Sequence, residues 1–97
     1  MEQIKSEEFN EKIKEGKVLI DCYADWCGPC RMLGPILEEL SNEIDTYKFY
    51  KLNVDEASDI ARQFGIMSIP TMLIFEDGEL KQKLIGLMSK EDIKKIL

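Results

Sequence analysis

The chain has 97 residues, of which 44% are hydrophobic, and its 19 acidic and 13 basic residues give a net charge of -6. This length and composition exclude a disordered chain and predict one folded domain over residues 1–97. The acidic balance argues against a nucleic acid or an anionic membrane surface as partner, because both attract clustered positive charge.

The numbers of cysteines and histidines exclude several classes of site and enzyme. Three cysteines are too few for a disulfide scaffold, and the absence of histidine excludes a Cys-His protease, a Cys/His zinc finger and a histidine general base. We expect neither a metal nor a cofactor. The first long apolar run begins only at Val18, so we expect no signal peptide, no membrane span and a cytoplasmic location.

The first half of the chain predicts a helix, a strand and a second helix. Ser6 is expected to cap a short helix that Gly16 ends. The nearly continuous apolar run over 18–24 predicts a central strand that is covered on both faces. A longer helix follows, whose apolar stripe consists of Leu33, Ile36, Leu37, Leu40 and Ile44.

The second half predicts three strands and two helices. They are a strand over 47–54, a helix over 58–64 that ends before Gly65, strands over 71–75 and 80–85 joined by the turn Asp77-Gly78, and a last helix that begins at Ser89.

This order of elements predicts the α/β class. We expect a central mixed, mostly parallel sheet with an antiparallel C-terminal hairpin and helices on both faces. In such sheets chemistry gathers just beyond the carboxyl ends of the strands. The segment Cys27-Gly28-Pro29-Cys30 lies there, directly after the strand over 18–24.

The spacing of Cys27 and Cys30 lets the two sulfurs meet across one helical turn. At a helix N-terminus, free N–H groups and the positive end of the helix dipole stabilise a thiolate on Cys27. Cys27 would attack a partner's disulfide, and Cys30 would resolve the mixed disulfide. Pro29 in the first turn loses no needed hydrogen bond. We expect Cys27 to be the more accessible cysteine of the pair.

Two other interpretations of the pair remain open. Zinc needs four ligands, so a single C-x-x-C could hold it only between two chains. The pair could also be two buried thiols without a role, although Trp26 and Pro29 beside it argue against this.

Several motifs together resemble the thioredoxin family over nearly the whole chain. They are Trp26-Cys27-Gly28-Pro29-Cys30, Asp21 ahead of it, Pro35 inside the following helix, Lys51-Leu52-Asn53-Val54-Asp55, Ile69-Pro70-Thr71 and Gly86. Cys22 and Tyr23 depart from the pattern, because many members have Phe and Trp there.

The resemblance implies a thioredoxin fold and a general protein disulfide reductase. It implies a monomer that a thioredoxin reductase re-reduces and that acts on client proteins with disulfides. Gly28-Pro29 is the dipeptide of the family's reductases, whereas its oxidases and isomerases usually place histidine there. The resemblance also implies that the Ile69–Pro70 bond is cis and faces the cysteines, where a client would dock.

The supporting residues each have a functional and a structural interpretation. A buried Asp21 would have a raised pKa and accept the proton of Cys30, but its strand could also be less buried there. Lys51 could moderate that carboxylate or simply be solvated. Trp26 could be a contact face or part of the core. Cys22 is expected to be a redox-inert buried thiol.

Two rival functions remain beside the disulfide reductase. The chain could be a binding module of this fold whose redox chemistry is idle. It could also be an oxidase or isomerase, which a strongly oxidising redox potential would indicate.

Overall fold

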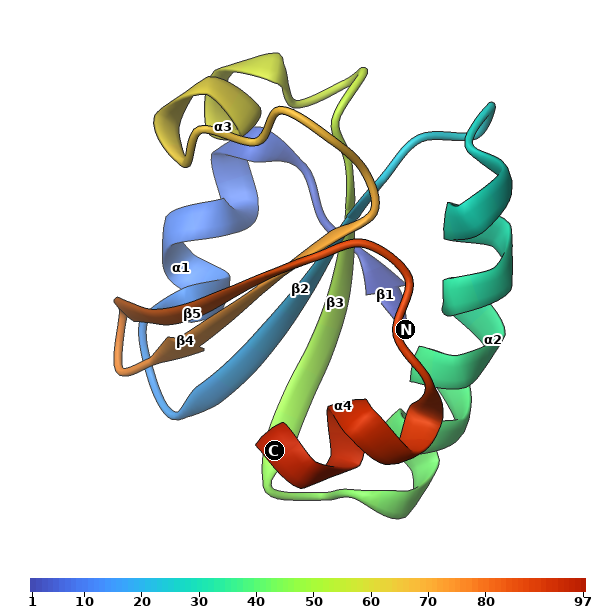
Figure 1. Ribbon diagram of the computed structural model, residues 1–97. Coiled ribbons are helices and arrows are strands. Elements are labelled where there is room, and N and C mark those ends of the chain that lie inside the picture. The colour runs from blue at the N-terminus through green and yellow to red at the C-terminus, as the bar shows by residue number, and fades with distance from the viewer.

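The computed structural model describes residues 1–97, and its helices cover both faces of one five-stranded sheet (Figure 1). The elements are β1 (Glu2–Gln3), a 3-10 turn (Ser6–Glu8), α1 (Phe9–Ile13), β2 (Lys17–Tyr23), α2 (Gly28–Glu43), β3 (Tyr47–Asn53), α3 (Ser58–Gln63), β4 (Thr71–Glu76), β5 (Glu79–Ile85) and α4 (Lys90–Ile96).

The sheet is mixed, as predicted, and its strand order is β1-β3-β2-β4-β5. Strands β1, β3 and β2 run parallel to one another, whereas β4 pairs antiparallel with both β2 and β5. β2 therefore lies in the centre, and its residues from Val18 to Cys22 are buried. Asp77-Gly78 forms the predicted hairpin turn, with Asp77 at φ 51° and Gly78 at φ 85°.

Side chains of β2 alternate between two cores. Val18, Ile20 and Cys22 pack with α1 and α3 on one face, whereas Leu19 packs with α2 and α4 on the other. Because the side-chain period of a strand is two, Asp21 points to the same face as Leu19, toward α2. The alternation thus places one carboxylate under the helix that carries the cysteines.

The N-terminal segment differs from the sequence prediction in two ways. Ser6 does not cap the first helix, because residues 6–8 form a 3-10 turn and the Ser6 hydroxyl donates to the Asp59 carboxylate (2.6 Å). That hydrogen bond ties the N-terminal segment to α3. The short strand β1 was not predicted, and it pairs with β3 through Glu2 and Gln3.

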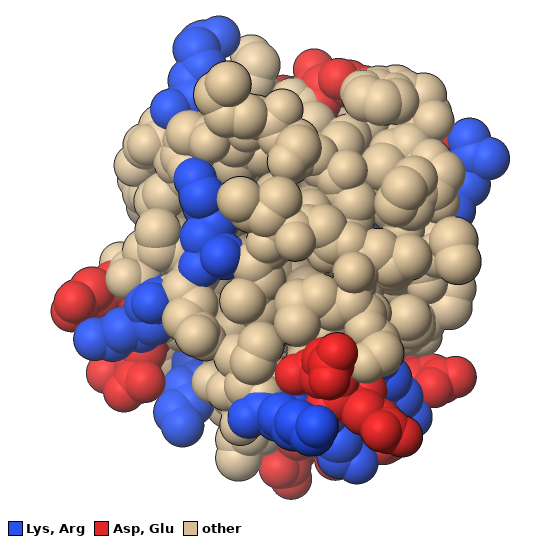
Figure 2. Space-filling view, viewed as in Figure 1, with Lys and Arg blue, Asp and Glu red and all other residues tan.

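Ion pairs join α2 to α4 on one side of the molecule. Lys90 pairs with Glu39 (3.1 Å) and with Glu43, and Lys94 pairs with Glu43 (3.4 Å). Figure 2 shows these charges gathered over α4, while the middle of the same view carries few charged side chains. None of the helices has the length and apolar character needed to cross a bilayer.

Candidate active site

Cys27 and Cys30 form a disulfide at the start of α2, with Cα atoms 5.3 Å apart. Cys27 is the N-cap residue, and the backbone N–H of Cys30 donates to its sulfur (3.2 Å). Gly28 begins the helix and Pro29 lies in the first turn. The expected junction of strand and helix is confirmed. One free N–H of a helix terminus points at the Cys27 sulfur and would stabilise a negative charge there.

The segment before β4 faces this cap. The Ile69–Pro70 bond is cis, as the resemblance implied, and the Ile69 carbonyl oxygen lies 3.8 Å from the Cys27 sulfur. The Pro70 carbonyl accepts the N–H of Gly86 (2.8 Å), and the Thr71 hydroxyl donates to the Ser68 carbonyl (2.7 Å). The segment that faces the disulfide is therefore tied by its own backbone to the end of β5.

The expectation that Cys27 is the more accessible cysteine is wrong for this state. Cys27 is 4% exposed and Cys30 is 5% exposed. Both pack with Ala24, and Val54 and Ile69 partly cover this small cluster. Exposure therefore does not distinguish the two sulfurs, whereas the N–H at the N-cap position does.

Asp21 is only 3% exposed, so the interpretation that its strand is less buried is wrong. Its Oδ1 atom is buried and has no hydrogen-bond partner. Burial raises the pKa of this carboxyl from 3.8 to about 7, although the charge of Lys51 partly counteracts the rise. Asp21 can therefore gain or lose a proton near neutral pH.

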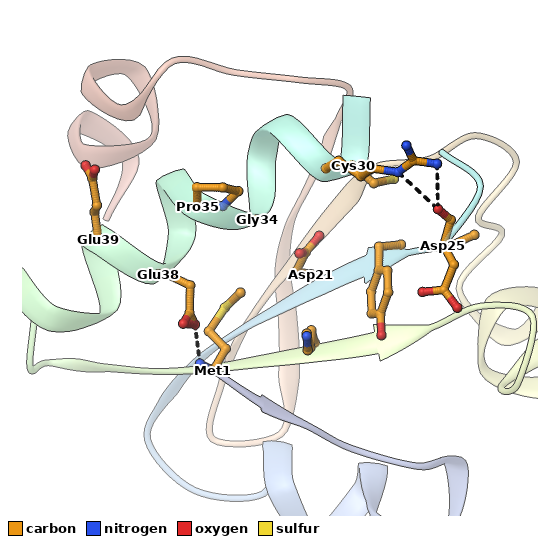
Figure 3. Close-up of a pocket in the computed structure, with 12 residues that line it drawn as sticks. Met1, Asp21, Asp25, Cys30, Gly34, Pro35, Glu38 and Glu39 are labelled. Carbon is orange, nitrogen blue, oxygen red and sulfur yellow. Dashed lines mark hydrogen bonds and ion pairs between the residues drawn. The ribbon is translucent and has the colours of Figure 1, made fainter. Parts of the chain in front are cut away.

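A cavity of about 760 Å³ connects Asp21 with the helix above it. Asp21, Cys30 and Lys51 all line this cavity, and Figure 3 shows Asp21 on β2 below the first turns of α2. Glu38 also lines it and pairs there with the N-terminal amine (Figure 3). The buried carboxylate and Cys30 therefore border the same cavity.

Lys51 stands opposite Asp21 in the parallel pairing of β2 and β3. It is half-buried, and its ammonium lies 5.5 Å from the centre of the Tyr23 ring. Lys51 is placed to moderate the carboxylate, because its charge lowers the pKa of Asp21.

Trp26 lies on the other side of the disulfide and is 68% exposed, so it is not part of the core. Its indole N–H donates to the Asp55 carboxylate (2.9 Å). A groove of about 420 Å³ lies beside it. The groove is lined by Val54, by residues of α3 and by the following loop, which includes Met67 and Ile69. Met67 is 95% exposed at its edge. The indole is thus held in place as one wall of an apolar groove.

Arg31 also contributes to the site, although sequence patterns do not single it out. Its guanidinium donates twice to the Asp25 carbonyl oxygen, at 3.2 and 3.1 Å (Figure 3). These bonds tie the first turn of α2 to the loop that precedes Cys27. The only sequence signal for Arg31 is that a basic residue follows the C-x-x-C motif. The sequence does not show that its partner is the backbone carbonyl of Asp25.

Cys22 lies away from this chemistry. It is a buried free thiol that packs in the core with α1 and α3, and burial raises its pKa to about 12. A thiol with such a pKa is almost entirely protonated at neutral pH and is a poor nucleophile. The prediction that Cys22 has no disulfide partner is confirmed.

Comparisons with known proteins agree with this site. The thioredoxin family model matches residues 1–97. A thioredoxin from Bacillus subtilis (strain 168) is 43% identical over 90 residues, which cover 92% of this chain and 86% of that protein. A thioredoxin from Chlamydia caviae is 40% identical over 94 residues, covering 97% of this chain and 92% of that protein.

A solved structure shows the same fold. A mutant thioredoxin from Halobacterium salinarum NRC-1 superposes with a TM-score of 0.91 and 34% identity, covering 98% of this chain and 85% of that one. The whole-length family match, the relatives and the C-x-x-C pair at the N-terminus of α2 agree, and the chain belongs to the thioredoxin family.

Proposed function

We propose that this protein is a general reductant of protein disulfides that a thioredoxin reductase re-reduces. As a member of the thioredoxin family it is a protein-disulfide oxidoreductase that works by dithiol–disulfide exchange at Cys27 and Cys30. The observation that carries the assignment of roles is the Cys30 N–H, which donates to the Cys27 sulfur at the N-cap of α2.

In the reduced protein, Cys27 is the nucleophile. Its thiolate attacks one sulfur of the client's disulfide, a mixed disulfide forms and the client's other sulfur leaves as a thiolate. The Cys30 thiolate then attacks the Cys27 sulfur, which releases the client's second thiolate and closes the Cys27–Cys30 disulfide. Two electrons and two protons pass to the client, and the reductase returns them to the cysteine pair.

Asp21 is the proton carrier of the second step. Cys30 must lose its proton before it attacks, and Asp21 lines the same cavity as Cys30. A general base works best when its pKa lies near the operating pH, and burial brings the pKa of Asp21 to about 7. Lys51 keeps that pKa from rising further, so that part of the Asp21 population is ionised and ready to accept a proton.

The client docks over Cys27 as an extended segment. The Ile69 carbonyl faces the Cys27 sulfur, and the extended backbone before the cis Pro70 can pair with a passing strand. Trp26 supplies an exposed apolar contact on one side. Gly28 has open space where a side chain would begin, so the start of α2 leaves room for the client.

We infer a cytoplasmic monomer. Cytosolic thiols are kept reduced, which suits a donor of electrons. The edge strand β5 carries Glu79, Lys81 and Lys83, and such charges discourage strand pairing between copies of a chain. Light scattering of the purified protein tests the monomer.

Insulin reduction coupled to NADPH and a bacterial thioredoxin reductase tests the proposed function. We expect NADPH oxidation that depends on this protein and precipitation of the reduced insulin chains. Replacing Cys27 and Cys30 by serine should abolish both signals. A redox-idle binding module would give no NADPH oxidation, and an oxidase would instead introduce disulfides into reduced, unfolded ribonuclease.

A further inference from the structure

Lys83 of the edge strand β5 makes an unusual contact with the end of α3. Its ammonium donates to the carbonyl oxygens of Phe64 (2.8 Å) and Gly65 (3.2 Å). The neighbouring Lys81 instead pairs with Glu79 on its own strand. The Lys83 ammonium thus donates to backbone carbonyls and forms no ion pair.

These two carbonyls lie at the C-cap of α3 and in the turn that follows it. α3 ends in a Schellman motif, in which the N–H of Gly65 donates to the Arg62 carbonyl (3.2 Å) and the N–H of Ile66 to the Ala61 carbonyl (2.9 Å). Gly65 makes this turn at φ 60°. Lys83 donates to the carbonyls of the C-cap residue Phe64 and of Gly65 after it, and its positive charge is favourable at a helix C-terminus.

The register of the hairpin directs Lys83 to that place. Lys83 pairs with Leu73 of β4, which belongs to the core under α1 and α3. Paired residues in a sheet point to the same face, so the stem of Lys83 passes over the side of the sheet on which α3 lies. Phe64 packs against the same core.

The chain that leaves this anchor forms the active-site groove. Ile66, Met67, Ser68 and Ile69 all line the groove beside Trp26, and Ile69 carries the carbonyl next to the Cys27 sulfur. Met67 is almost wholly exposed and holds nothing in place. The wall is therefore held by the packing of Ile66 and Ile69 and by its two ends, which are the turn at Gly65 and the bonds around Pro70.

We propose that Lys83 is a positioning residue for client binding, which holds the end of α3 and thereby the groove wall 66–69. This inference rests on the proposed function, because it concerns the docking of the protein clients. Without the two hydrogen bonds the wall samples other conformations. The apparent affinity for a client then falls in proportion to the fraction of molecules in which the groove is formed.

The test compares Lys83→Met with Lys81→Met and Lys83→Arg in the intact chain. Methionine keeps an apolar stem of similar length but removes the donor, whereas arginine keeps a donor and a charge. The readouts are KM and kcat for insulin, the rate constant for a small aromatic disulfide that does not need the groove, and amide hydrogen exchange of residues 66–69.

For Lys83→Met we expect KM for insulin to rise about twofold to tenfold, the range that one net hydrogen bond represents, and kcat to stay unchanged. Exchange at 66–69 should accelerate, and the small disulfide should react at the wild-type rate. Lys81→Met should match the wild type, and Lys83→Arg should recover most of the loss.

An unchanged KM and unchanged exchange in Lys83→Met would overturn the proposal, as would equal effects in Lys81→Met. A lower kcat with the same KM would also overturn it, because the cysteines and not the groove would then be affected. Failure of the proposed function gives a different result, because the wild-type protein itself would then not reduce insulin.

Discussion

Asp21 and Lys51 stand opposite each other on neighbouring parallel strands, and only the lysine reaches solvent. The pKa of Asp21 is about 7 because burial outweighs the attraction of Lys51. Because of the balance between these two effects, the buried carboxyl titrates near neutral pH, where it can exchange a proton with a thiol.

Removing the lysine charge should raise the pKa of Asp21 further. Lys51→Met eliminates the one cause that lowers this pKa, and the burial that raises it remains. The titration of the Asp21 carboxyl carbon by NMR measures the change. Lys48→Met on the same strand is the matched control, since its exposed side chain is absent from the causes of the shift. A pKa that falls or stays constant in Lys51→Met would contradict this account.

Asp21→Asn should slow insulin reduction because the proton carrier is lost while the side-chain shape is kept. We expect turnover at neutral pH to fall by at least about tenfold, toward the low end of what general base catalysis contributes. The wild-type rate should rise with pH through an inflection near 7, since only ionised Asp21 accepts a proton, and the variant should lack this inflection. An unchanged pH profile in the variant would exclude Asp21 as the proton carrier.

The same substitution should stabilise the protein at alkaline pH. Between pH 3.8 and about 7 the folded chain holds a proton on Asp21 that the unfolded chain has lost, so wild-type stability falls as the pH rises through this range. Asparagine does not titrate. Urea unfolding should show Asp21→Asn to be more stable by about 4 kcal/mol near pH 8, and by less than about 1 kcal/mol near pH 4. A constant difference at both pH values would show that Asp21 does not titrate as described.

Cys22→Ala should leave disulfide reduction unchanged and reduce stability. The thiol is fully buried in the core under α1 and α3, and its loss leaves a small cavity, which costs about 1–2 kcal/mol. In the oxidised protein an alkylating reagent should label Cys22 only after unfolding. Rapid labelling of Cys22 in the folded oxidised protein, or a large loss of activity in Cys22→Ala, would give this thiol a role.

Much of the fold follows from patterns of the sequence. The apolar run of β2 and the hairpin turn at Asp77-Gly78 carry strong local signals, and the structure contains both. β1 was missed because two residues show no period and owe their pairing to β3. Local sequence predicts Ser6 as a helix cap, but its hydroxyl donates to Asp59, which is far away in the sequence.

In the site, too, residues with a strong local signal are predictable, whereas those that depend on distant partners are not. The cysteine pair and Asp21 are visible because their residue types are unusual where they stand. Arg31 and Lys83 are not, since a basic residue on a surface normally indicates solvation and their partners are backbone carbonyls. The equal exposure of Cys27 and Cys30 depends on the packing of Val54 and Ile69, which only the folded chain brings to them.

Trapping the mixed disulfide distinguishes the roles of Cys27 and Cys30. Cys30→Ser removes the resolving sulfur, so its Cys27 should stay bound to a client, and Cys27→Ser should trap nothing. Each reduced variant, with Cys22 replaced by alanine, is incubated with oxidised insulin and analysed by non-reducing electrophoresis and mass mapping. We expect an adduct through Cys27 in Cys30→Ser alone. An adduct through Cys30 in Cys27→Ser, with none in Cys30→Ser, would contradict this expectation.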